Sequence, residues 1–213
     1  MSHKLTGRSS HVIRHASLLH GTDSAVEFTL GNMSKIAADQ FAEMSAPMLR
    51  LTEAKYLFDQ FKSARNAEPN HGLFLLTVYF DAFLFCLVSI EEMVDTTTRD
   101  NLRAIPSFLF FKALRNIATH HSVLSGINGK FDRPISRIAS VGVGCSVEFS
   151  EQFFLLPDKL RAIFDAVLKE RPSEKLTVEA ARNYLSQLEA SDTTIMLVDI
   201  IQVVVSEVEP HVA

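Results

Sequence analysis

The stretch LFLLTVYFDAFLFCLVSI, from Leu73 to Ile90, decides the fold. Fifteen of its 18 residues are apolar, and the run is interrupted only by Thr77, Asp81 and Ser89. Its apolar residues run all round a helix, which is typical of a helix that other helices cover on every face. The stretch therefore predicts a buried central helix of a helical bundle, from about Gly72 to Val94.

The same stretch is long enough to cross a bilayer, so a small membrane-associated protein is an alternative. Asp81 lies at its centre, where a carboxylate is costly inside a membrane. The flanks hold no basic cluster that would set an orientation, and the N-terminus lacks the continuous apolar segment of a secretory signal. We therefore expect a cytoplasmic protein without membrane contact, and expression in soluble form without detergent would exclude the alternative.

Composition excludes several classes of protein. The chain has 213 residues, of which 47% are hydrophobic and 22% charged, so it is neither disordered nor fibrous. Its formal net charge of −4 excludes a protein whose whole surface coats nucleic acid, so any such contact needs a local basic patch. The two cysteines, Cys86 and Cys145, lack the spacing of a zinc knuckle. We expect neither a metal nor a cofactor.

The rest of the chain is mostly helical in pattern. Residues 1–30 read as an N-terminal arm or a peripheral helix, and residues 31–213 as a single helical domain. A two-residue period around 141–150 predicts a strand, and with 135–140 or 152–156 it can form a β-hairpin. The last segment, from Thr194 to Val208, is read as a helix, with a strand as the competitor. The predicted fold is mainly α, a helical bundle with a small β-hairpin insertion around residues 135–156.

A second stretch, FKALRNIATHH, carries the side chains best suited to chemistry. Near the end of an apolar helix it places Arg115, Asn116, His120 and His121. Asn116 and His120 are four residues apart and share a helix face, and Arg115 can reach the same cleft through its long side chain. An imidazole can transfer protons near neutral pH, and a guanidinium matches phosphate oxygens. The group favours phosphoryl-ester chemistry, although it could instead only complement the free carbonyls and dipole of the helix end.

These residues, on a helix that follows a long apolar one, resemble the signature of the HEPN superfamily (higher eukaryotes and prokaryotes nucleotide-binding domain). The resemblance covers residues 34–125 and implies a HEPN-like helical bundle. Many members of the superfamily are metal-independent endoribonucleases of toxin–antitoxin or other defence systems, in which the 2′-hydroxyl of the RNA is the nucleophile. Members commonly form homodimers that bring two motifs into one cleft.

The resemblance also implies roles for the motif residues. His120 would act in proton transfer, Arg115 would support the transition state, and Asn116 would orient one or both of them. His121 would have a supporting place, next to a dimer partner. We therefore expect a homodimer and RNA as the substrate.

Asp81 is expected to support this site. A charge among apolar helical neighbours is costly unless it is paired. Our hypothesis is that Asp81 faces Arg115 or His120 from the adjacent helix and positions the guanidinium or the imidazole. The alternative is a purely structural pairing with another cation or with backbone donors.

Local charge supports contact with RNA. Residues 99–121 carry four basic residues against Asp100 alone, a balance of +3. Such a patch is the footprint that an otherwise acidic protein needs to bind a phosphate backbone. We therefore predict RNA contacts at Arg99, Arg103 and Lys112, with a solvated helix face as the alternative reading.

The sequence thus predicts a metal-independent endoribonuclease of HEPN type, acting in a toxin–antitoxin or defence system, with an antitoxin as a further partner. The alternative function is a non-catalytic HEPN-like module that binds a nucleotide or a partner protein, such as a nucleotidyltransferase. In that case the side chains of the motif would be engaged in hydrogen bonds or ion pairs with other residues of the same chain.

Overall fold

The computed structural model describes residues 43–64, 69–118, 135–141, 149–191 and 194–212. Side chains are described in all of these except 69–73, 136–141 and 149–152. Apart from Glu43 and Met44, the described residues belong to one unit, Ser45–Ala213. The predicted division between residues 1–30 and 31–213 lies outside the described residues.

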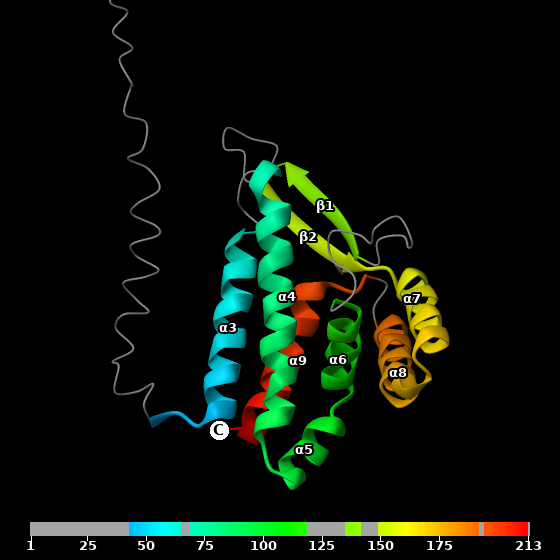
Figure 1. The fold of residues 1–213 in the computed structure, drawn as a ribbon. Helices are drawn as coiled ribbons and strands as arrows, with labels where there is room; N and C mark the ends of the chain where they lie inside the picture. Colours follow the sequence, from blue (N-terminus) through cyan, green and yellow to red (C-terminus); the bar gives the residue numbers. More distant parts are fainter. Residues whose placement is uncertain (1–42, 65–68, 119–134, 142–148, 192–193, 213) are drawn as a thin grey trace, which may run out of the picture. The chain divides into compact units, whose positions relative to one another are not determined.

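The described part of the chain is a mainly α bundle with one small sheet (Figure 1). Its helices are α3 (Ala46–Ala64), α4 (Pro69–Met93), α5 (Thr96–Arg103), α6 (Pro106–Ala118), α7 (Pro157–Glu170), the 3₁₀-helix η1 (Pro172–Glu174), α8 (Lys175–Ser191) and α9 (Leu197–Val212). Strands β1 (Ile135–Val141) and β2 (Phe149–Leu155) pair antiparallel, with the first residue of β1 opposite the last residue of β2. The predicted mainly α bundle with a β-hairpin around residues 135–156 is confirmed.

Helix α4 lies between α3 and α6 and provides much of the core (Figure 1). Its fully buried side chains include Leu76, Phe80, Leu84, Leu87 and Ile90. The ring of Phe83 lies 6.3 Å from that of Phe58 in α3 and 5.8 Å from that of Phe111 in α6. Phe61 of α3 contacts Phe153 of β2, which fixes the hairpin to the bundle. The long apolar run therefore serves as a core helix, as predicted.

The described residues leave one face of α4 uncovered, so among them the apolar residues of this helix are not enclosed on every side as predicted. Phe74 is 73% exposed, Val78 43% and Phe85 42%. With Asp81 they follow helical spacing, so the four side chains form one stripe along α4, the outer stripe. Within the described residues, α3, α5 and α6 pack against other sides of α4 and leave this one open. The segment Phe74–Met93 has the length and composition of a membrane span, with 44% of it buried in the bundle.

The helices that follow α4 position the site. Asp95 caps α5 by accepting a hydrogen bond from the backbone N–H of Thr98 at 3.0 Å. Pro106 then begins α6, in the first-turn position where its missing N–H is not needed. The 3₁₀-helix η1 leads directly into α8, which begins at Lys175. The last segment is a helix, since its buried residues recur every three or four positions.

Candidate functional site

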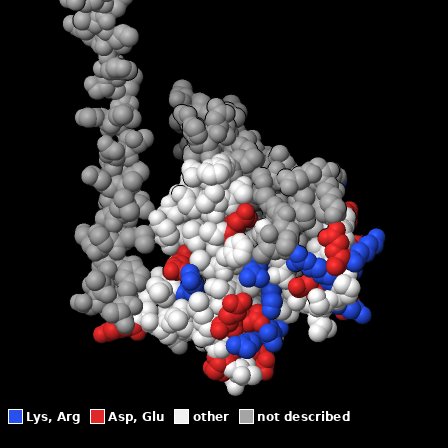
Figure 2. Space-filling view, viewed as in Figure 1, with Lys and Arg blue, Asp and Glu red and all other residues white. Residues whose placement is uncertain are grey.

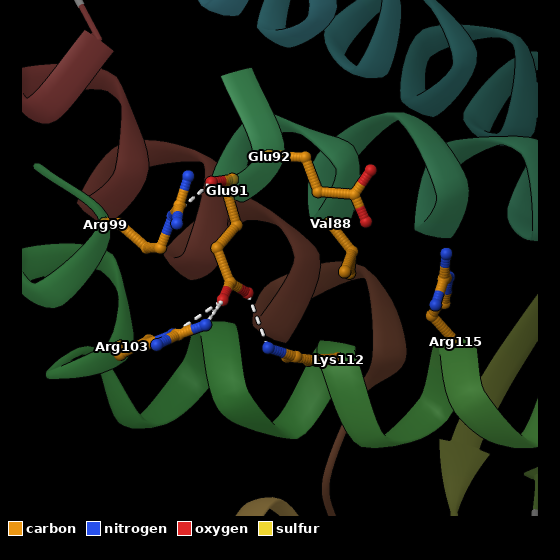
Figure 3. Close-up of a pocket in the computed structure, with 7 residues that line it drawn as sticks. All are labelled: Val88, Glu91, Glu92, Arg99, Arg103, Lys112 and Arg115. Carbon is orange, nitrogen blue, oxygen red and sulfur yellow. Dashed lines mark hydrogen bonds and ion pairs between the residues drawn. The ribbon is translucent and has the colours of Figure 1, made fainter. Parts of the chain in front are cut away.

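A pocket of about 320 Å³ lies where the end of α4 meets α5 and α6 (Figure 3). It is lined by Val88, Glu91, Glu92, Arg99, Arg103, Lys112 and Arg115. Four cations and two carboxylates leave the lining with a formal net charge of +2. Figure 2 shows charged side chains gathered at this end of the described unit, beside a largely uncharged surface. The three predicted RNA contacts and Arg115 therefore come together in one pocket.

Glu91 is the centre of this pocket. Its Oε1 accepts hydrogen bonds from Nε and Nη2 of Arg103, each at 2.5 Å, and its Oε2 accepts one from Nζ of Lys112 at 2.6 Å (Figure 3). Its backbone carbonyl accepts a hydrogen bond from Nε of Arg99 at 3.0 Å, and Arg99 also donates to the carbonyl of Val94. Glu91 thus touches three of the four cations, which come from two different helices.

Arg115 is held differently. Its guanidinium lies over the ring of Phe85, 5.3 Å from the ring centre, and its Nη1 donates to Oδ1 of Asn116 at 3.3 Å. Within the described part of the chain, its buried Nε has no hydrogen-bond partner. Among the described residues, Arg115 is the one cation of this pocket that contacts neither a carboxylate nor a backbone carbonyl. Its guanidinium therefore keeps donors for a further acceptor.

Asn116 links the motif to the second half of the chain. While its oxygen accepts the bond from Arg115, its Nδ2 donates to Oε2 of Glu174 in η1 at 2.8 Å. The amide is therefore fixed in one orientation, in which it restricts the guanidinium. His120 and His121, the two imidazoles of the predicted site, lie outside the described residues.

Asp81 does not pair with Arg115, so this form of the hypothesis is wrong. Its Oδ1 is buried and has no hydrogen-bond partner among the described residues. Burial raises the pKa of Asp81 to about 6, and no cation among the described residues offsets that effect. The physical reason is position along the helix: Arg115 lies over Phe85, one turn further toward the pocket. The other predicted partner, His120, lies outside the described residues.

Sequence reasoning missed Glu91, although a signal for it exists. Glu91 and Glu92 end an otherwise apolar helix, and a helix C-terminus disfavours acidic side chains because its free carbonyls are already negative. An acid at such a place needs cations, and the next basic residues along the chain are those of the pocket. Asking what balances Glu91 would have found the pocket.

No protein-family model matches the chain, and no curated protein or solved structure matches it either. The resemblance to HEPN proteins rests on the motif residues and on the order of the helices. Within the described part of the chain, no three His, Cys, Asp or Glu side chains converge as metal ligands would.

Proposed function

We propose that the chain is a metal-independent endoribonuclease of HEPN type that binds the RNA backbone in the pocket between α4, α5 and α6. The observation that supports this most is that Arg115 shares one pocket, of net charge +2, with the three predicted RNA contacts. Phosphates are attracted to such a concentration of cations. Arg115 has donors to spare, and guanidinium groups match phosphate oxygens in geometry and charge.

The proposed reaction is attack by a ribose 2′-hydroxyl on the adjacent phosphorus. An imidazole accepts the hydroxyl proton, the P–O bond to the 5′ oxygen breaks, and that oxygen takes up a proton as it leaves. The products are a 2′,3′-cyclic phosphate and a 5′-hydroxyl. His120 transfers protons, and Arg115 stabilises the charge on the phosphate oxygens. Asn116, held by Glu174, orients the guanidinium.

Cleavage of a labelled single-stranded RNA in the presence of a chelator tests this proposal. We expect products with cyclic phosphate ends, and a loss of about 100-fold or more in the rate for both Arg115→Ala and His120→Ala. Arg161→Ala is the matched control, because Arg161 pairs with Glu189 outside the pocket. Cleavage by H120A at the wild-type rate would contradict the role of His120, and activity that requires a divalent metal would contradict the mechanism.

The outer stripe of α4 supports the expected homodimer. It exposes Phe74, Val78 and Phe85 in a row, which is unusual unless another surface covers them. A two-fold contact would place the outer stripe of each copy against the same stripe of the other and remove these apolar side chains from water.

Oligomeric state is the measurement for the homodimer. We expect the wild-type chain to sediment as a dimer and the double variant Phe74→Ser, Val78→Ser to sediment as a monomer. Leu176→Ser is the control, since Leu176 is 82% exposed on α8, away from the stripe. A wild-type chain that sediments as a monomer, or a double variant that stays dimeric, would contradict the proposal that the outer stripe is the dimer interface.

One observation favours the non-catalytic module as a second candidate. Arg103 and Lys112 are engaged by Glu91, and Asn116 is engaged by Glu174, as expected of a motif consumed in internal pairs. This candidate predicts binding of a nucleotide, or of a partner such as an antitoxin or a nucleotidyltransferase, without RNA cleavage. Nucleotide binding by the wild-type chain, together with no cleavage of any RNA tested, would favour it over the ribonuclease.

A further inference from the structure

Glu91 occupies a place where an isolated carboxylate is unfavourable. It lies in the last turn of α4, near free carbonyls, and only 4% of the residue is exposed. Burial works to raise the pKa of Glu91, but hydrogen bonds from Lys112 and Arg103 outweigh it, and the pKa lies below its ordinary value. The carboxylate is therefore ionised because two cations hold it.

The side chains of Glu91, Lys112 and Arg103 are increasingly exposed to solvent, in that order. The side chain of Glu91 is 6% exposed, that of Lys112 22% and that of Arg103 51%. The carboxylate thus lies at the base of the group, and the two cations lie between it and solvent (Figure 3). An anion that enters the pocket meets the cations rather than the carboxylate.

We propose that Glu91 is a positioning residue for phosphate binding: it fixes Arg103 and Lys112 so that their remaining N–H groups form one subsite for a backbone phosphate. This inference rests on the proposed function, because it takes the RNA backbone as the ligand. Long basic side chains lose rotamer freedom when they bind. Because Glu91 already restricts the rotamers of Arg103 and Lys112 in the free protein, less conformational entropy is lost when the RNA binds, and binding is favoured.

For the variant Glu91→Gln, a positioning role and an effect of charge alone predict opposite changes in RNA affinity. Glu91→Gln raises the net charge of the pocket by one, and charge alone would then tighten RNA binding. It also removes the anion that orders two cations, and positioning predicts weaker binding. Glu92 lines the same pocket but is exposed, and no ion pair joins it to a basic side chain in the described residues. Glu92→Gln therefore makes the same change in charge without releasing a cation.

The experiment measures binding of a fluorescent single-stranded oligonucleotide to the full-length chain at several salt concentrations. Its riboses carry 2′-O-methyl groups, so the nucleophile of the proposed reaction is blocked. We expect E91Q to bind about tenfold more weakly than the wild-type chain and E92Q to bind slightly more tightly. Each phosphate that is no longer neutralised lowers the slope of log K against log salt by about 0.7, so the E91Q slope falls by about 0.7 to 1.4.

The outcomes separate this inference from the proposed function. If E91Q binds the oligonucleotide as tightly as the wild-type chain or more tightly, as E92Q is expected to, the positioning role of Glu91 is overturned. The proposed function still stands in that case, because the wild-type chain binds the oligonucleotide. A wild-type chain that binds no oligonucleotide overturns both. If circular dichroism shows E91Q unfolded, Arg103→Lys replaces it, since lysine keeps the charge but cannot place two N–H groups on Oε1. We expect about a fivefold loss for R103K, and wild-type affinity would overturn the inference.

Discussion

Two of the three carboxylates of helix α4, those of Asp81 and Glu91, lie in surroundings that differ sharply. Asp81 lies on the outer stripe, with a buried Oδ1 that has no partner and a pKa raised by burial to about 6. Glu91 is buried more deeply, yet Lys112 and Arg103 hold its pKa below the ordinary value. Partners, rather than burial alone, decide the state of each carboxylate. At the pocket end of α4 the buried carboxylate is paired with cations, whereas the carboxylate on the outer stripe has no such partner among the described residues.

The largest expected effect comes from removing each carboxylate in turn. Glu91→Ala should lower the free energy of unfolding by about 2 kcal/mol, because it leaves two neighbouring cations without their anion. The loss stays below that of a fully buried pair, since Arg103 is half exposed. Asp81→Ala should raise the free energy of unfolding by about 1 kcal/mol, because it removes an unpaired buried acceptor. Urea unfolding at pH 7.5 and low protein concentration measures both, and changes of the same sign would refute the contrast.

The pH dependence of stability should also differ in sign between the two residues. Because the pKa of Asp81 is raised from 3.8 to about 6, the folded chain binds its proton more tightly than the unfolded chain. Asp81 therefore makes stability fall as pH rises from about 4 to about 6. Glu91 has a lowered pKa, so its contribution is present above 4.5 and is lost as pH falls through the lowered value.

Two charge-removing variants isolate these contributions. Asp81→Asn should remove the fall in stability between about pH 4 and pH 6. Glu91→Gln should leave the fall between about pH 4.5 and pH 6 unchanged and remove part of the loss of stability at lower pH. Unfolding free energies from urea titrations across pH 3 to 7 give the two difference curves. A D81N difference curve that is flat across this range would show that burial does not shift the pKa of Asp81.

The fold was largely predictable because hydropathy dominates it. The run Leu73–Ile90 is so apolar that its place in the core follows from composition. The β-hairpin is formed by Ile135–Val141 and Phe149–Leu155, which flank the predicted strand around 141–150, and residues 142–148 of that strand lie outside the described residues. The open stripe was not predictable. Composition states how apolar a helix is, but which sides its neighbours cover depends on how α3 and α6 pack against it.

The site was predictable only in its local part. Arg99, Arg103, Lys112 and Arg115 stand out because basic residues concentrate in a short segment. The pairing of Asp81 with Arg115 failed because it depends on the alignment of two helices along each other, which helical periodicity does not determine. Glu91 was missed because the two cations that hold its carboxylate come from helices later in the chain.

The smallest expected effect concerns Arg115, which lies between the two regions, over Phe85 on one side and in the pocket on the other. In the described residues Glu174 acts on Arg115 through Asn116, so Glu174→Ala should remove one of the bonds that orient the amide and loosen the guanidinium. A hydrogen bond that acts on Arg115 indirectly, through Asn116, should contribute about 0.5 kcal/mol to binding, so oligonucleotide affinity should fall about twofold.

Glu179→Ala is the matched control, because Glu179 is an exposed glutamate at the start of α8 that pairs only weakly with Lys175, at 3.8 Å. Both variants remove one negative charge, so any general attraction of RNA is the same in each, and their ratio reports the bond to Asn116. If E174A and E179A bind the oligonucleotide equally, Asn116 holds Arg115 without help from η1. The orientation of the guanidinium would then be a property of α6 and Phe85 alone.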